Sequence, residues 1–246
     1  MDIEAKKGKQ SQNPLDVYSK EVILLANKRI GGVLDPTWKP LPNKPVKHPS
    51  FNKTNINEIY QKALIITNDK EISFMIAYIV SIEQPKQFPN YNLFGLNLWG
   101  KDGTGGWGKN IAQFFSYQFI MKDSNKENPY IWFAGFDSLE DAIKAVSIII
   151  KSRLIGRTQT KMILTYTTKW MSGISYTYKK LNNKEIETYE DLLKAKELFG
   201  KNNFKKEYEI TSEIIKNWKN YNSIFFNLVN KLNLSLVKKD NDYVLV

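Results

Sequence analysis

Apolar residues recur at helical spacing in two adjacent stretches, 55–67 and 69–83, which predicts two consecutive helices. The inward positions are Ile56, Ile59, Tyr60, Ala63 and Leu64 in the first helix and Phe74, Met75, Tyr78, Ile79 and Ile82 in the second. The second stretch is apolar nearly all round, which is typical of a central, buried helix. Pro85 and Pro89 prevent this helix from continuing.

A further helix is predicted to begin after Ser138, because Ser138-Leu139-Glu140-Asp141 matches a capping box. Its apolar face consists of Leu139, Ala142, Ile143, Val146 and Ile150. Before it, residues 90–136 are rich in glycines and aromatic residues, which indicates loops with short strands or one short helix. After it, residues 155–178 are rich in Thr and Tyr and ambiguous, with one more helix expected around 160–166.

The two ends of the chain have different patterns from this middle part. Residues 1–13 are polar and are expected to form a flexible tail, and residues 14–54 a helix followed by a proline-rich strap. After Lys180 the pattern changes to charged amphipathic helices at 188–199 and 212–232. A strand-like alternation over 235–246 is broken at Asn241. Residues 181–246 are therefore predicted to form a helical C-terminal appendage.

Composition narrows the possible chemistry. The 246 residues carry a formal net charge of +11, which attracts polyanions such as nucleic acid, anionic lipid or anionic polymers of a bacterial wall. The lysines are spread along the chain, which favours a generally basic surface over a dedicated nucleic-acid face. Without cysteine, and with His48 as the single histidine, the chain has no disulfide, no thiolate metal site and no motif that needs two histidines. No cofactor is implied.

Two further features of the sequence do not predict a binding site or a membrane segment. Gly103, Gly105 and Gly108 match the spacing of a dinucleotide fingerprint, but they lack the preceding strand and the βαβ context that would give them a phosphate to hold. The amino-terminal residues are polar, so we expect no signal peptide, and no apolar run is long enough to predict a membrane span.

Three segments, in order and at similar intervals, resemble the glucosaminidase family of bacterial autolysins, flagellar muramidases and phage lysins. They are Ile79-Val80-Ser81-Ile82-Glu83, Tyr91-Asn92-Leu93-Phe94-Gly95-Leu96, and Phe133-Ala134-Gly135-Phe136-Asp137-Ser138-Leu139-Glu140-Asp141-Ala142. Tyr166-Thr167-Thr168 is a fainter fourth match. The resemblance implies an α+β, mainly helical chain whose residues 55–180 form a lysozyme-like domain with a small irregular or β lobe.

The resemblance also implies that Glu83 donates a proton to the glycosidic oxygen. Physical chemistry agrees, because an acid at the junction of an apolar helix and a cleft is desolvated and tends to keep its proton. The plainer alternative is that Glu83 ends a helix and points into solvent. Residues 84–87, Gln-Pro-Lys-Gln, depart from the family's small and glycine-rich pattern, which leaves open whether the loop after Glu83 is rebuilt or inactive.

The remaining site residues are assigned around this acid. Glu127 is the best-placed second carboxylate, ahead of Asp123 and Asp102. Candidate substrate-binding residues are Asn92 and Phe94 in the signature, Trp99 and Trp107 among the glycines, and Tyr166, which could orient the substrate. Core packing is the alternative for Asn92, Phe94 and Tyr166, and one of the two tryptophans is expected to be core.

The resulting hypothesis is an enzyme that cleaves peptidoglycan glycan strands, as an endo-β-N-acetylglucosaminidase, a muramidase or a lytic transglycosylase. A phage lysin or virion-borne lysin is the source expected without a signal peptide, located in the virion or in the host cytoplasm before release. Anionic wall polymers and other virion proteins are further candidate partners. The alternatives are a non-catalytic virion or tail protein with a degenerate lysozyme-like domain, and a basic nucleic-acid-binding protein.

Overall fold

The structure, a computed structural model, describes residues 55–83, 91–96, 117–122 and 130–246. The chain divides into two compact units. Residues 55–83 and 150–246 form one, which we call the helical unit. Residues 1–54 and 84–149 form the other, which we call the strand-containing unit, and only 91–96, 117–122 and 130–149 of it are described. The predicted tail at 1–13 and the helix and strap at 14–54 lie outside the described residues.

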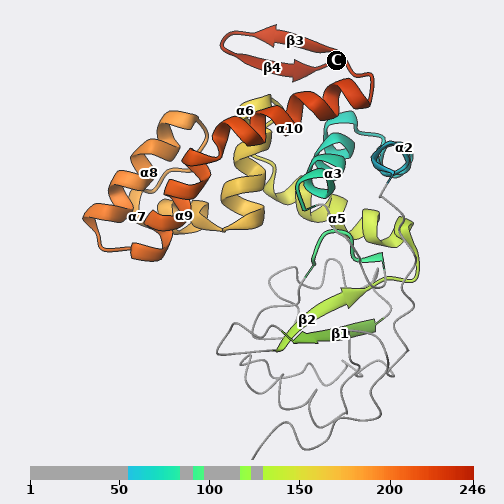
Figure 1. The fold of residues 1–246 in the computed structure, drawn as a ribbon, viewed down its shortest axis with the longest axis horizontal. Helices are drawn as coiled ribbons and strands as arrows, with labels where there is room; N and C mark the ends of the chain where they lie inside the picture. The colour runs from blue at the N-terminus through green and yellow to red at the C-terminus, as the bar shows by residue number, and fades with distance from the viewer. Residues whose placement is uncertain (1–54, 84–90, 97–116, 123–129) are drawn as a thin grey trace, which may run out of the picture. The chain divides into compact units, whose positions relative to one another are not determined.

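The helical unit begins with the two predicted helices, α2 (Ile56–Thr67) and α3 (Lys70–Glu83) (Figure 1). The Asn55 side chain caps α2 by accepting hydrogen bonds from the backbone N–H groups of residues 57 and 58. Asn68 ends α2 in the left-handed conformation, and the Asp69 carboxylate then caps α3 through the N–H of Ile72 at 3.0 Å. Residues 72–80 are all buried, which confirms the predicted central apolar helix.

The strand-containing unit holds an antiparallel pair, β1 (Tyr117–Lys122) and β2 (Tyr130–Gly135), in which Tyr117 lies opposite Gly135. Short strands were expected in this region. Helix α5 (Leu139–Arg153) follows and begins as predicted, because the Ser138 hydroxyl accepts the N–H of Asp141 and donates to the Asp141 carboxylate. All five residues of its predicted apolar face are buried.

In the helical unit, the ambiguous segment after residue 155 forms three helical pieces. Thr158 caps α6 (Gln159–Leu164), which continues into a π-helix, η3 (Thr165–Met171), before α7 (Ile174–Asn182) begins at Gly173. The helix expected around 160–166 is therefore confirmed, whereas the π-helical continuation and α7 were not predicted.

The C-terminal helices are α8 (Tyr189–Lys201), α9 (Lys205–Lys216) and α10 (Trp218–Lys231). The predicted single helix at 212–232 is wrong, since the chain turns at Asn217 between α9 and α10. There the side-chain amide of Asn217 donates to the Glu213 carbonyl at 3.1 Å, which satisfies a carbonyl at the end of α9. The last residues form a hairpin of β3 (Leu236–Lys239) and β4 (Asp242–Leu245), which turns at Asp240 and Asn241.

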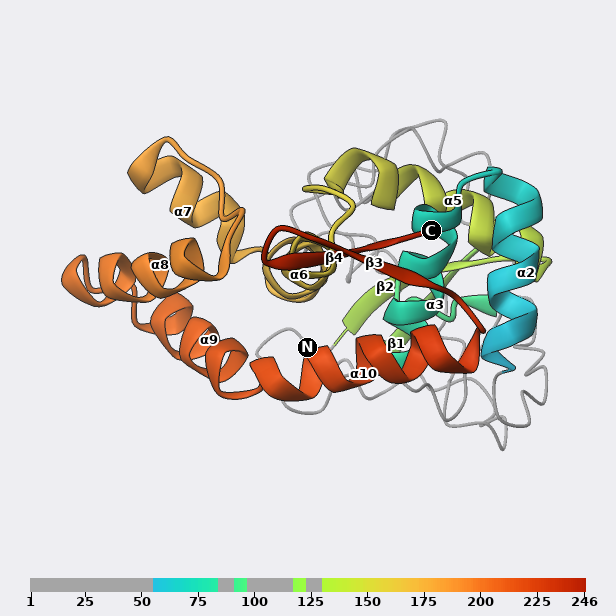
Figure 2. The same cartoon turned by 90° about the horizontal axis from the view of Figure 1, so that it is seen from above.

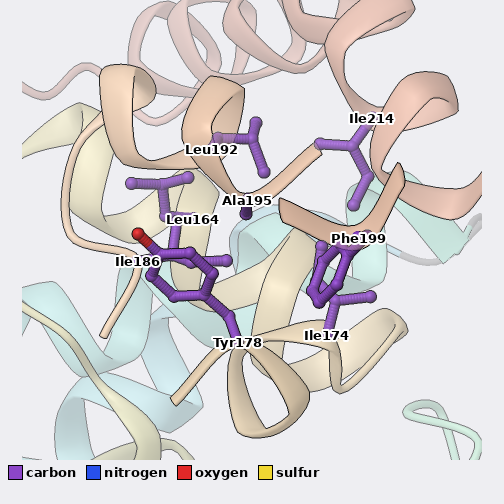
Figure 3. Close-up of a cluster of buried hydrophobic side chains, with 8 residues drawn as sticks. All are labelled: Leu164, Ile174, Tyr178, Ile186, Leu192, Ala195, Phe199 and Ile214. Carbon is purple, nitrogen blue, oxygen red and sulfur yellow. The ribbon is translucent and has the colours of Figure 1, made fainter. Parts of the chain in front are cut away.

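One part of the core of the helical unit joins α6, α7, α8 and α9. It is a cluster of buried side chains (Figure 3), namely Leu164, Ile174, Tyr178, Ile186, Leu192, Ala195, Phe199 and Ile214. The cluster combines side chains from both sides of residue 180. The helices after that position therefore share a core with α6 and α7.

Helix α10 also packs against α3 and α6 (Figure 2). The Phe225 ring lies 4.8 Å from that of Phe74 and 5.9 Å from that of Tyr78, measured between centroids. The Tyr78 hydroxyl donates to the Tyr221 carbonyl at 3.0 Å, and the N–H of Thr160 donates to Asp242 at the start of β4. The predicted boundary between residues 180 and 181 therefore does not coincide with a boundary between the compact units.

The described part of the chain is mainly helical with two small antiparallel strand pairs, which agrees with the predicted α+β, mainly helical class. A lysozyme-like arrangement stays a prediction. Among the described helices, none combines the length and apolar character needed to cross a membrane.

Candidate functional site

Glu83 is the last residue of α3 and the last residue of the helical unit before the chain leaves it, to return at Ile150. Burial along α3 ends at Val80, residues 81 and 82 are partly buried, and Glu83 is exposed. The desolvation expected around this carboxyl group is therefore not found in the structure. The exposed position does leave the carboxylate accessible to a ligand.

The structure brings Glu83 together with Tyr166, the other predicted site residue of the helical unit. The Tyr166 hydroxyl donates a hydrogen bond to Oε1 of Glu83 at 3.0 Å, across 83 residues of sequence. Tyr166 lies in η3 and is only 2% exposed. A buried, fixed phenol thus holds an accessible carboxylate.

The π-helix that carries Tyr166 is stabilised by its threonines. In a π-helix the backbone N–H groups reach the carbonyl five residues back, which widens the turn. The hydroxyls of Thr165, Thr167 and Thr168 each donate to the carbonyl four residues back, at 2.8, 2.9 and 2.7 Å. The Thr165 hydroxyl also accepts the N–H of Ile155. Three buried threonine hydroxyls therefore donate to main-chain carbonyls within this uncommon helix geometry next to the site.

Burial, and then the negative charge of Glu83, raise the pKa of Tyr166 far above its ordinary value. The phenol therefore stays protonated at any working pH, and it can only donate to the carboxylate. Its ring packs edge-on against Tyr78 at 5.9 Å and is tilted against Tyr221 at 6.1 Å, which restricts its movement.

Tyr221 of α10 packs against Tyr166 at this site, and the sequence did not single it out as a site residue. It is partly exposed, and its hydroxyl contacts the Met171 sulfur at 3.8 Å. Burial and the charges of Glu213 and Glu83 raise the pKa of Tyr221. In the sequence, Tyr221 is one aromatic residue on an amphipathic helix, and nothing in that pattern distinguishes it from a packing residue.

Asn92 and Phe94 belong to the strand-containing unit, and both are buried, at 1% and 3% exposure. The Asn92 side chain closes its own loop: its amide donates to the Leu96 carbonyl at 3.0 Å, and its oxygen accepts the Leu96 N–H at 2.8 Å. Gly95 has a φ of 58° within this turn. These contacts fit the packing alternative for the signature.

Glu127, Trp99 and Trp107 lie outside the described residues, as do Asp102 and Asp123. Within the described ranges, no group of three or more His, Asp or Glu side chains is arranged to hold a metal ion. The site that can be described therefore consists of Glu83 and Tyr166, with Tyr221 and Met171 beside them.

Comparison of the chain with models of protein families, with curated proteins and with solved structures finds no match.

Proposed function

We propose that this chain is an enzyme that cleaves the glycan strands of bacterial peptidoglycan, with Glu83 as the proton donor. The hydrogen bond between Tyr166 and Glu83 is the observation that carries the proposal. Two separate matches to the glucosaminidase pattern contain these residues, which are 83 positions apart in the sequence.

The proposed chemistry is general acid catalysis at the glycosidic oxygen. The protonated Tyr166 phenol orients the Glu83 carboxyl group through their hydrogen bond. A glycan strand lying over this exposed group displaces water from it, and loss of water favours the uncharged form of a carboxyl group, which can give a proton. In this proposal Glu127 stays the candidate second carboxylate, and a transglycosylase would need none.

The second candidate is a non-catalytic virion or tail protein. It is favoured by the closed hydrogen bonding of Asn92 and by the burial of Phe94, because both side chains are used for packing. On either proposal the protein is phage-borne, and the enzyme would be an endolysin or a virion-associated lysin. Virion proteins and anionic wall polymers are then its further partners.

The deciding experiment compares the wild-type protein with Glu83→Gln and with Glu58→Gln, a matched change of another exposed helical glutamate. Each protein is incubated with peptidoglycan, and soluble fragments are analysed by mass spectrometry. We expect fragments from the wild type and from Glu58→Gln but not from Glu83→Gln. Reducing GlcNAc, reducing MurNAc or anhydro-MurNAc ends would identify the cleaved bond. If all three proteins are inert on walls from several bacteria, the scaffold proposal replaces the enzyme.

A further inference from the structure

Tyr221 and Met171 form a partly exposed surface that adjoins Tyr166, whose hydroxyl binds Glu83. Met171, the last residue of η3, is 42% exposed, and its sulfur lies 3.8 Å from the Tyr221 hydroxyl. The Tyr221 ring lies 6.1 Å from the ring of Tyr166, between centroids, and Tyr166 binds Glu83 directly. The aromatic ring of Tyr221 and the thioether of Met171 are therefore both partly exposed. The ring contacts Tyr166, which in turn binds the proposed proton donor.

Helix α3 contacts the Tyr221 part of this surface. The buried hydroxyl of Tyr78 donates to the main-chain carbonyl of Tyr221 at 3.0 Å, and the Tyr78 ring packs on both Tyr166 and Phe225. These contacts use the backbone of Tyr221 and leave one part of its side chain uncovered. A binding surface benefits from such fixing, because less conformational entropy is lost when a ligand binds.

Two carboxylates influence the Tyr221 phenol through their charge. The charges of Glu213 on α9 and of Glu83 on α3 both raise the pKa of the phenol, after burial as the main cause. The Glu213 side chain is 62% exposed and is accompanied by Lys216 at 3.9 Å. A pyranose ring has an apolar C–H face and a rim of hydroxyls. The Tyr221 ring matches the apolar face, and the exposed Glu83 carboxylate, bound by the adjoining Tyr166, can accept hydrogen bonds from the hydroxyl rim.

We propose that Tyr221 and Met171 are substrate-binding residues on which an N-acetylhexosamine ring of a β-linked glycan strand rests beside Glu83. This inference rests on the proposed function and gives the C-terminal helices a role in it. Helix α10 then belongs to the enzyme's active unit, although it lies outside the 55–180 segment that carries the family resemblance.

The test uses three variants of the full chain. Tyr221→Leu keeps apolar volume but removes the flat ring, Tyr221→Phe keeps the ring, and Tyr208→Leu is the matched control. Tyr208 is a half-exposed tyrosine on α9 whose ring lies under Lys196 and against Gly200. The substrate is peptide-free glycan strand prepared from a Gram-positive wall. Thermal unfolding and circular dichroism are used to verify that each variant is folded.

We expect Tyr221→Leu to raise KM about tenfold, with a much smaller change in kcat, because a ring contact contributes to binding in ground state and transition state alike. Tyr208→Leu should stay close to the wild type, and Tyr221→Phe, which keeps the ring, should recover most of the binding that Tyr221→Leu loses. Binding is measured in parallel on the Glu83→Gln background by NMR titration with the same strands, and Tyr221→Leu should weaken the dissociation constant by a similar factor.

These readouts separate the two proposals. If the wild type cleaves and Tyr221→Leu leaves both KM and binding unchanged, the binding surface is refuted and the proposed function stands. If no cleavage occurs but the strands bind and Tyr221→Leu weakens binding, the enzyme proposal fails and the surface stands. Absence of both cleavage and binding overturns both. If Tyr221→Leu does not fold, Met171→Ala is tested in its place. A raised KM in Met171→Ala supports the binding surface, and an unchanged KM refutes it.

Discussion

Replacing Phe225 by alanine should destabilise α3 as much as α10. Phe225 is buried on α10, and its ring contacts Phe74 and Tyr78 of α3, at centroid distances of 4.8 and 5.9 Å. The substitution removes the ring from between two helices that are separated by about half of the chain. If α10 and α3 belong to one cooperative unit, a defect at their contact weakens both.

The size of the effect follows from this burial. Truncating a fully buried phenylalanine to alanine costs about 3–5 kcal/mol, which includes the cavity that remains. In native-state hydrogen exchange, such a loss lowers the protection of amides that open only with the whole unit by about two to four orders of magnitude. We expect this decrease in the amides of residues 74–80 on α3 as well as in those of α10.

Phe226→Ala is the internal control. Phe226 is adjacent in α10 but only partly buried, and its ring packs edge-on against Tyr243 of β4 at 5.5 Å. Its loss should cost about 1 kcal/mol. If the alanine variant at 225 does not fold, Phe225→Leu should give the same pattern at about 1 kcal/mol. A large loss of amide protection in α10 with no change in α3 would refute a cooperative unit that includes both helices. The predicted C-terminal appendage would then be the better description.

Three further predictions concern single contacts. Arg157 forms ion pairs with Asp69 at 2.9 Å and Glu71 at 2.7 Å, and its hydrogen bond lowers the pKa of Asp69 to about 2. Arg157→Gln should therefore cost about 1 kcal/mol in urea unfolding at neutral pH, discounted because Arg157 is 47% exposed, and the difference should disappear as the pH falls from about 4 to 2. Thr188→Ala, which removes the capping box of α8, should cost about 1 kcal/mol in the same assay. Tyr166→Phe should reduce kcat on glycan strands about tenfold, because the Glu83 carboxyl group loses the hydrogen bond that orients it.

Each of these has a result that would contradict it. The sign for Asp69 follows from its lowered pKa: the ion pair stabilises the protein wherever the unfolded chain has lost its proton, and this contribution fades as the folded carboxylate is protonated. A pH-independent difference for Arg157→Gln would reject that account. A Thr188→Ala variant as stable as the wild type would show that water satisfies the N–H of Asp191 at the start of α8 as well as the Thr188 hydroxyl does. Wild-type kcat in Tyr166→Phe would remove Tyr166 from the site.

Local patterns in the sequence predicted those elements whose ends and faces are encoded nearby. Helix α3 is the clearest example, because its apolar run, the preceding Asp69 and the following Pro85 all indicate the same helix. Helix α5 is another, where Ser138 and Asp141 make the predicted capping contacts. In both, the residues that decide the element lie within a few positions of it.

The break at Asn217 could not be read in the same way. The apolar positions Ile214, Phe225 and Leu228 are compatible with one continuous helix, and the asparagine is only a weak breaker. Packing decides the break, since Ile214 joins the cluster with Phe199 and Leu192, whereas Phe225 packs on α3. The same holds for η3, which lies in the segment that was ambiguous in the sequence and whose threonine hydroxyls donate to carbonyls within a π-helix.

The candidate site was predictable only where a motif was available. Glu83 and Tyr166 were singled out by their resemblance to a family pattern, and their contact was found in the structure. Tyr221 and Met171 have no such pattern. An aromatic residue on an amphipathic helix is ordinarily a packing residue, and the position of Tyr221 beside Tyr166, far away in sequence, depends on how α10 packs in the fold.

The contacts that join α10 to α3 are also the contacts that position the site. Tyr78 binds the Tyr221 backbone and packs against both Tyr166 and Phe225, while Tyr166 holds Glu83. Removing α10 would leave the Tyr78 hydroxyl without its acceptor and expose one side of the Tyr166 ring. Residues 181–246 therefore supply part of the packing around Tyr166, the residue that binds Glu83. We expect a segment restricted to residues 55–180 to keep the residues that resemble the family pattern but to lose the α10 contacts of Tyr78 and Tyr166.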